Sequence, residues 1–310
     1  MAADEHSLIP VVAGPTAAGK SAVALWLASK FPVTIIVADS RQIYRHFDVG
    51  TAKPTPAELA AVPHRGIDLI EPTQRYSAAA WAEDADRWID DAFSEGRIPL
   101  VVGGTGFYLR ALFEPLFEEP ELDAERRRRL QAALVTLPLA ELRHWTSALD
   151  PDRAHLGRTQ LLRAIEVALL SGHRLSALHR ARARPARRTA RYLVVDPGPT
   201  LVARIETRLD AMLAGGWMEE VRRLVDTIPE NAPAWNASGY RVIRDHVRGT
   251  VDAARTRHAV LVETRQYAKR QRTWIRHQLD DRHVTHLDPS DSSWMAVAER
   301  WLRETIRRPA

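Results

Sequence analysis

The segment Gly14-Pro15-Thr16-Ala17-Ala18-Gly19-Lys20-Ser21 decides the fold, because it matches the phosphate-loop pattern G-x-x-x-x-G-K-[ST]. An apolar run, Ile9–Val12, leads into the segment, and an apolar helical pattern that contains Val23 and Leu27 follows it. The segment therefore lies between a strand and a helix, which is the context that supports a phosphate loop.

The chemistry of this loop follows from its residue types. Its glycines allow successive backbone N–H groups to point at one anion, and the N-terminus of the following helix adds partial positive charge. Lys20 would reach a terminal phosphate, and the Ser21 hydroxyl would ligate Mg²⁺. We therefore expect the segment to bind a diphosphate or polyphosphate. The loop alone does not say whether that ligand is ATP.

Length and composition describe an ordinary globular protein. The 310 residues suggest about two domains, with ~150 residues per domain as a guide, and the chain is 45% hydrophobic and 27% charged. The absence of cysteine excludes disulfides, thiolate metal sites and a cysteine nucleophile, and fits a reducing compartment. The polar N-terminus is no signal peptide and no apolar stretch is long enough to span a membrane. We expect a cytoplasmic protein that acts as a monomer.

Short apolar runs alternate with helical patterns from residue 9 to about 112. This alternation predicts an α/β fold, with a P-loop parallel sheet core covered by helices. Ligands of such sheets bind at the carboxyl ends of the strands, where the phosphate loop, Asp39–Gln42 and Gly103–Gly106 lie. The expected strands and helix are Ile9–Val12, Thr34–Ala38, Ala78–Phe93 (the helix) and Leu100–Val102.

A region of different composition interrupts this core. It begins with acidic residues, continues with Arg126-Arg127-Arg128-Arg129 and helical patterns, and carries no acid from Val167 to Val195. We expect a helical insertion domain over 114–191 and a core formed by 1–113 and 192–310. Leu193–Val195 would return the chain to the sheet as a strand, and the chain from Leu201 onward is expected to be helical.

One predicted helix near the C-terminus carries a row of cations. The net charge of +5 is modest, so the placement of charge matters more than its total. Cations without acids four residues away, beside aromatic side chains, suit an RNA backbone with an accessible base, whereas a solvated helix face would give the same pattern. The cations at i, i+4, i+7 and i+11 are Arg265, Lys269, Arg272 and Arg276, with Tyr267 and Trp274 beside them.

Further strings add a resemblance along nearly the whole chain. They are Val37–Tyr44, Asp48-Val-Gly-Thr-Ala-Lys-Pro54, Pro63–Arg65, Tyr76–Ala78, Val102–Tyr108, Arg163–Glu166, Gly239-Tyr240 and Thr264–Trp274. With these strings the chain resembles the tRNA dimethylallyltransferases, also called tRNA isopentenyltransferases. The strings Asp48–Pro54 and Ala268–Gln271 are far more specific than the phosphate loop.

The resemblance implies a reaction and its partners. The family transfers the dimethylallyl group of dimethylallyl diphosphate to the exocyclic N6 of adenosine 37, beside the tRNA anticodon, and diphosphate leaves. The phosphate loop would then hold a prenyl diphosphate with Mg²⁺ as cofactor, since it recognises a Mg²⁺-bound diphosphate whatever is attached to it.

The resemblance also implies catalytic residues. Asp39 would be the general base that removes the N6 proton, Arg222 would hold the diphosphate with Lys20 and Ser21, and Thr105 would lie near the acceptor adenosine. Each residue has another interpretation. Asp39 suits a Mg²⁺ ligand or a helix cap, and Thr105 suits a turn. Arg222 could instead pair with Glu219, which would leave its neighbour Arg223 as the true equivalent.

The tRNA contacts of the family map onto separate segments of this chain. These residues are Asp39, Ser40, Arg41, Gln42, Thr105, Arg126, Gln160, Arg163, Asn236, Ser238, Gly239, Tyr240, Arg241, Lys269, Arg270, Gln271, Arg272, Trp274 and Arg276. Gln42 is expected to hydrogen-bond bases of the anticodon loop. The family's usual string before Arg163 is shorter and changed at 154–160, and the arginine-rich stretch 180–191 could compensate electrostatically.

Two other functional classes remain open at this stage. A small-molecule P-loop kinase would use the same phosphate loop, but it needs a set of lid arginines and would not explain the C-terminal cations. An adenylate prenyltransferase that acts on free nucleotide would share the N-terminal motifs, but it would lack the basic insertion and tail.

Overall fold

The chain divides into two compact units. The computed structural model describes residues 8–114, 116–117, 120, 122–181, 183–184, 186 and 188–307. One unit is Met1–Phe113 together with Arg187–Ala310, and the other is Glu114–Ala186. The second boundary thus falls slightly before the predicted residue 191.

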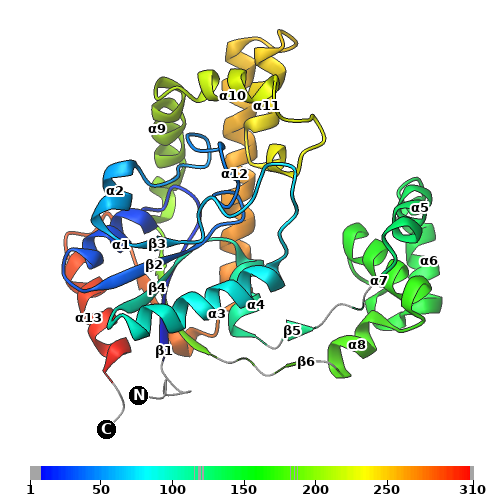
Figure 1. The fold of residues 1–310 in the computed structure, drawn as a ribbon, viewed down its shortest axis with the longest axis horizontal. Coiled ribbons are helices and arrows are strands. Elements are labelled where there is room, and N and C mark those ends of the chain that lie inside the picture. The colour runs from blue at the N-terminus through cyan, green and yellow to red at the C-terminus, as the bar shows by residue number, and fades with distance from the viewer. Residues whose placement is uncertain are drawn as a thin grey trace. The chain divides into compact units, whose positions relative to one another are not determined.

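The larger unit is built on a six-stranded parallel sheet with the order β3-β2-β4-β1-β7-β8 (Figure 1). Its strands are β1 (Leu8–Ala13), β2 (Val33–Ala38), β3 (His64–Arg65), β4 (Ile98–Gly103), β7 (Thr189–Val195) and β8 (Val284–Leu287). The α/β prediction and the four expected strands are confirmed. The prediction that the chain is helical from Leu201 onward is wrong, because β8 adds an edge strand to β7.

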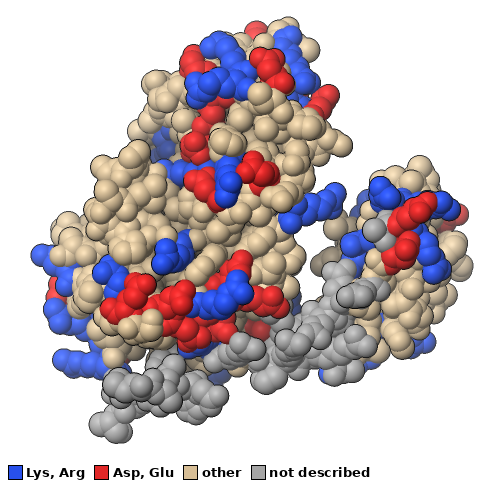
Figure 2. Space-filling view, viewed as in Figure 1, with Lys and Arg blue, Asp and Glu red and all other residues tan. Residues whose placement is uncertain are grey.

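Helices cover the sheet. The helix α3 (Ala78–Ser94) packs on β2 and β4 and contacts α4 (Gly106–Phe113), whereas α1 (Lys20–Ala28) and α13 (Trp294–Ile306) contact each other. The predicted helix corresponds to α3, which is capped by the Ser77 hydroxyl and buries Trp81, Ala85 and Ile89. Apolar residues at 3.6-residue spacing give α3 one buried face. Glu83, Asp90 and Asp91 are exposed on the outer face, where acidic side chains gather (Figure 2), whereas Asp86 is buried.

The remaining α-helices of this unit are α2 (Pro56–Ala61), which precedes β3, and α9 (Leu201–Ala214), α10 (Trp217–Val225), α11 (Tyr240–Val247) and the 26-residue α12 (Ala253–Gln278). In Figure 1, α9, α10, α11 and the upper part of α12 form the top of this unit. The long helix α12 contacts α4, α9 and α11. One helix therefore touches both the sheet-covering layer and the C-terminal helices.

The smaller unit is helical, and it has a core of its own. Its elements are β5 (Leu116–Phe117), α5 (Ala124–Leu134), α6 (Leu139–Leu149), α7 (Arg158–Ser171), α8 (Leu175–Ala181) and β6 (Ala183–Arg184), with β5 and β6 antiparallel. Leu134, Leu142, Leu161 and Ile165 form a buried apolar cluster. The buried carboxylate of Glu166 pairs with Arg127 and Arg163 across it. In the described ranges of both units, no helix is both long and apolar enough to cross a membrane.

Candidate active site

The phosphate loop lies at the carboxyl end of β1, and its backbone needs glycine at two points. Gly14 has φ +155°, and a Cβ there would lie 2.3 Å from the carbonyl oxygen of Val195. Gly19 has φ +103° and caps the N-terminus of α1. The N–H groups of the first turn of α1 therefore open onto the loop, as an anion site requires.

Two cavities meet beside this loop. The first, of about 410 Å³, is lined by Lys20 and Ser21 of the loop and by Arg204 and Arg208 of α9. The second, of about 360 Å³, is lined on one side by apolar residues of the C-terminal helices. Four residues line both cavities: Thr16, Ala17, Asp39 and Arg208. Asp39 and Arg208 are thus the charged residues at the junction.

Charges at the junction perturb one another. Burial lowers the pKa of Lys20 to about 8, the charge of Arg208 lowers that pKa as well, and the charge of Asp39 opposes both effects. Burial also lowers the pKa of Arg208, and Asp39 again opposes this shift. The Lys20 ammonium donates to the carbonyl oxygen of Pro15 at 2.8 Å. Lys20 and Arg208 are therefore two cations that repel each other, and an anionic ligand between them would offset this repulsion.

The segment after β2 orients Asp39. Its Oδ1 accepts a hydrogen bond from the backbone N–H of Arg41 at 2.8 Å, so the carboxylate caps its own turn. The backbone N–H of Ser40 donates to Thr105 Oγ1 at 3.1 Å, and Thr105 also hydrogen-bonds Tyr267 of α12. The structure thus places Thr105 as a support beside Asp39, with its hydroxyl engaged by protein groups.

The structure does not place Arg222, the predicted diphosphate arginine, beside the phosphate loop. Arg222 lies on the exposed face of α10 and pairs with Glu219 at 2.9 Å, and neither Arg222 nor Arg223 lines the two cavities. The arginine that does so is Arg208, one helix earlier. It lies on the same face of α9 as Ile205, Leu209 and Met212, which line the second cavity. The available signal was an arginine between the apolar residues Ile205 and Leu209 of one helix face.

Several predicted tRNA contacts have hydrogen-bond partners or packing within the protein. The Gln42 amide donates to the carbonyl oxygens of Thr51 and Ala52, both at 3.0 Å. The buried Gln271 accepts from the N–H of Thr16 at 2.7 Å and donates to the carbonyl oxygen of Gly104 at 2.9 Å. Tyr240 is fully buried. In this structure the side chains of Gln42 and Gln271 hold loops, and Tyr240 is part of the core.

The prediction of an unpaired row of cations on α12 is also wrong in part. Arg265 pairs with Glu206, and Arg272 makes a two-pronged ion pair with Asp196 at 2.5 and 2.8 Å. Within the described part of the chain, no ion pair is found for Lys269 or Arg276, and both are exposed. The acids come from α9 and from the loop after β7, so the spacing on α12 could not reveal them.

Other predicted RNA contacts do gather around one opening. They line the second cavity together with Asp39, and they come from three separate parts of the chain. These residues are Arg41, Asn236, Ser238, Arg241 and Arg270. Trp274 and Gly239 lie deeper: the indole packs against Gly106, and Gly239 packs against Trp217 and Val260.

The predicted tRNA contacts in the smaller unit have different surroundings. Arg126 is exposed in α5, Gln160 accepts from the N–H of Gly157 at the start of α7, and Arg163 pairs with Glu166 at 3.0 Å. Some arginines of the arginine-rich stretch have ion-pair partners within the protein. Arg180 pairs with Asp152, and Arg188 pairs with Asp86 and Asp90. Arg182 and Arg187 lie outside the described residues.

The sequence of this chain is similar to those of known protein families and individual proteins. The chain matches the IPP transferase family over residues 42–278 and the isopentenyl transferase family over residues 8–69. A tRNA dimethylallyltransferase of Bordetella petrii is 42% identical over 285 residues, which cover 88% of this chain and 91% of the relative. One of Stenotrophomonas maltophilia is 40% identical over 304 residues, covering 93% and 96%.

Solved structures are similar over the same extent. A tRNA delta(2)-isopentenylpyrophosphate transferase from Staphylococcus epidermidis has a TM-score of 0.68 and 28% identity, covering 97% of this chain and 100% of its own. A eukaryotic dimethylallyltransferase acting on tRNA has a TM-score of 0.78 and 25% identity, covering 95% of this chain and 77% of its own.

Proposed function

Because the chain belongs to the IPP transferase family, we propose that it transfers the dimethylallyl group of dimethylallyl diphosphate to N6 of adenosine 37 in tRNA, beside the anticodon. The observation that carries this proposal is the junction of the two cavities at Asp39 and Arg208. One cavity is lined by the phosphate loop, and the other is lined by arginines and aromatic residues. A donor and an acceptor bound there would meet at the junction.

The donor cavity, as we name the 410 Å³ cavity, suits a diphosphate. The loop N–H groups and the cations Lys20, Arg204 and Arg208 surround the position of the anion. As the bond between C1 of the prenyl group and the diphosphate oxygen breaks, negative charge grows on that oxygen. Fixed cations stabilise this charge more than the charge of the bound donor, which lowers the barrier.

The residues also fit Mg²⁺ as a cofactor. Ser21 lies in the first turn of α1 and lines the donor cavity, and no cluster of three acidic or histidine side chains exists in the described residues. Mg²⁺ bound to substrate phosphates takes few protein ligands and keeps several waters, so a single hydroxyl is sufficient. We propose that Ser21 ligates a Mg²⁺ carried by the diphosphate, and that this ion supplies further neutralisation of the leaving group.

Asp39 is the proposed general base. The adenine amine is a weak nucleophile, so its attack on C1 requires positioning and removal of a proton. Asp39 faces both cavities, and therefore it can accept the N6 proton on the acceptor side while the C1–O bond breaks on the donor side. The new N6–C1 bond, the protonated carboxyl and free diphosphate account for all atoms and charges.

The acceptor cavity, as we name the 360 Å³ cavity, suits a base taken from an RNA loop. Arg41, Arg241 and Arg270 line its opening and would bind the phosphates that flank the base. A base must leave its stack to reach Asp39, as in other base-modifying enzymes. We propose that the protein acts as a monomer on the anticodon stem-loop of tRNA.

One assay tests the function and its alternatives. The protein is incubated with Mg²⁺, labelled dimethylallyl diphosphate and either unmodified tRNA, AMP or ATP. Label on adenosine 37 of tRNA is the expected result. Label on AMP or ATP alone would indicate an adenylate prenyltransferase. Consumption of ATP without prenyl transfer would indicate a kinase, and either outcome would overturn the proposal.

A further inference from the structure

The loop Asp48–Pro54 carries the most specific string of the sequence, and it lies between the two cavities. Gly50 and Thr51 line the acceptor cavity, whereas Ala52, Lys53 and Pro54 line the donor cavity. The proposed reaction gives none of these residues a chemical role. A segment that forms part of the wall of both cavities must nevertheless be held in one place if both substrates are to meet correctly.

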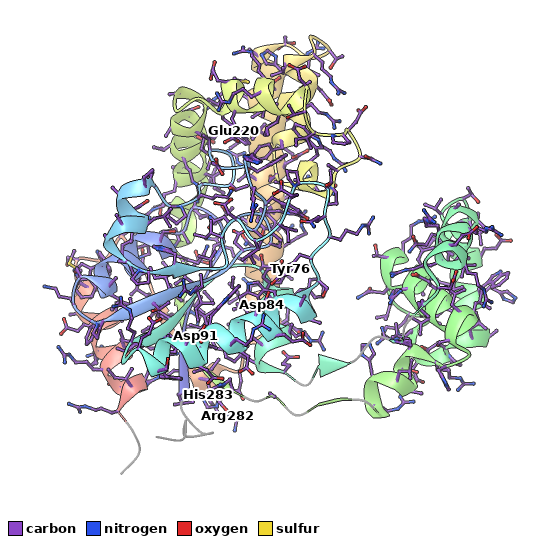
Figure 3. All side chains as sticks on the ribbon, in the orientation of Figure 1. Tyr76, Asp84, Asp91, Glu220, Arg282 and His283 are labelled. Atoms are coloured by element: carbon purple, nitrogen blue, oxygen red, sulfur yellow. The ribbon has the colours of Figure 1, made fainter. Side chains whose placement is uncertain are left out.

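A buried carboxylate from α10 holds the start of this loop. Glu220 is 3% exposed, and its Oε2 accepts hydrogen bonds from the backbone N–H groups of Asp48 at 2.9 Å and Val49 at 2.7 Å. Its Oε1 accepts the hydroxyl of Tyr240 at 2.6 Å. Figure 3 shows Glu220 in the upper part of the larger unit, among the C-terminal helices. An ionised carboxylate tolerates such burial when donors surround it.

Tyr240 continues the same network from α11. Its hydroxyl oxygen accepts from the backbone N–H of Gly50 at 3.1 Å while it donates to Glu220. Burial and the Glu220 charge raise the pKa of Tyr240, so the hydroxyl keeps its proton. Three consecutive backbone N–H groups of the loop therefore end on two side chains from the C-terminal helices.

Packing strengthens this attachment. The Tyr240 ring lies 4.8 Å from Phe47 and 5.3 Å from Trp217, between ring centroids. A Cβ on Gly50 would lie 2.1 Å from the Trp217 indole, so only glycine fits there. At the other end of the loop, Lys53 Nζ donates to Asp48 and Asp68 at 2.6 and 2.5 Å. The loop is thus fixed from both ends.

We propose that Glu220 and Tyr240 are positioning residues, which hold the loop Asp48–Pro54 as a shared wall and thereby set the donor and acceptor cavities relative to each other. This inference rests on the proposed function, because it assigns these residues a role in the same site. In the string Glu219–Arg222, the interior Glu220 is the residue that holds the loop. Arg222 does not contact the loop, because it pairs with Glu219 at the surface.

Two isosteric variants test the role, and the chain offers a matched control. Tyr240→Phe keeps the aromatic packing and removes one acceptor and one donor. Glu220→Gln keeps the shape and replaces the charge. Glu219→Gln makes the same change one residue earlier, where the side chain is exposed. For the first two variants we expect kcat/KM for dimethylallyl diphosphate to fall roughly 10- to 100-fold, since a ~1 Å displacement has effects of that size.

Two further readouts separate positioning from a loss of stability. Binding of inorganic diphosphate, measured by calorimetry, should weaken in Tyr240→Phe and Glu220→Gln, and hydrogen exchange of the peptide 48–54 should accelerate. The Kd for tRNA should stay within about twofold of the wild-type value, because contacts to the phosphate backbone of the RNA dominate the affinity. Glu219→Gln should match the wild type throughout.

The proposal fails if both interior variants, assayed well below their unfolding temperatures, keep wild-type kinetics and diphosphate affinity. It also fails if Glu219→Gln has an equal effect. Diphosphate binding and exchange need no transfer reaction, so they report on the loop even if the wild type prenylates a different acceptor. A failure of the proposed function is therefore distinguishable from a failure of this one.

Discussion

The phosphate loop and the helix α12 both carry cations that the sequence alone assigned to phosphate groups. In the structure, these two sets of cations have different surroundings. Lys20 faces a cavity with a second cation beside it, whereas Arg265 and Arg272 are neutralised by acids from other elements. The loop motif dictates a backbone shape, and that shape creates an anion site wherever it occurs. A helical spacing only places side chains on one face, and the partner across that face decides what they do.

The largest expected effect tests the phosphate-loop side of this comparison. Asp39→Asn should lower turnover by about 10²- to 10⁴-fold, the usual contribution of general acid–base catalysis, with little change in tRNA Kd. Single-turnover prenylation of a tRNA transcript measures it. Near-wild-type turnover would show that Asp39 is not the base.

A second pair of variants separates the two arginines. Arg208→Gln should lower kcat about 10²- to 10³-fold, as expected when a group that stabilises developing charge is removed. Arg222→Gln should remain close to wild type, because Arg222 lies at the surface beside Glu219. Equal effects of the two substitutions would contradict the assignment of Arg208.

The third test uses pH. The pKa of Lys20 is lowered to about 8 in the free protein, so the ammonium is lost as pH rises through that value. Because a diphosphate binds the charged form, KM for the donor should rise with pH above 8, on the order of tenfold for each further pH unit. Lys20→Arg keeps its charge and should flatten this rise between pH 7 and 9. A flat wild-type profile would exclude the effect.

The smallest effects sharpen the comparison on α12 itself. Lys269→Gln and Arg276→Gln should each reduce the slope of log K against log[salt] for tRNA binding by ~0.7 if each neutralises one phosphate. Arg265→Gln should leave the slope unchanged, because Arg265 already pairs with Glu206. Titrations at several salt concentrations measure this. A slope that changes equally in all three variants would mean that the ion pair opens to the RNA.

Sequence patterns predicted the elements whose cause is local. The strands β1, β2, β4 and β7 are short apolar runs, and the loop between β1 and α1 follows from its glycines. The strand β3 has two residues and β8 has four, too few for a periodic signal. Both strands exist because a neighbour pairs with them.

The site residues that the sequence did not reveal were missed for the same reason as these strands, because their roles depend on contacts with other parts of the chain. Glu220 was one acid in a pair. Its spacing from Trp217, Val221 and Leu224 puts it on the apolar face of α10, but the string does not show which donors it meets there. Gln42 was assigned to RNA bases, but its amide holds the carbonyl oxygens of Thr51 and Ala52. Such contacts join residues distant in sequence, and only the folded chain shows them.

The separate core of the smaller unit has a consequence for how this protein can change over evolution. Leu134, Leu142, Leu161 and Ile165 pack on one another within that unit, so their constraints are independent of those on the sheet. Substitutions at distant, unshared contacts add without coupling. A change of length or sequence within residues 114–186 is therefore expected to leave the shape of the two cavities, lined by the larger unit, unchanged. The altered stretch 154–160 falls within this unit.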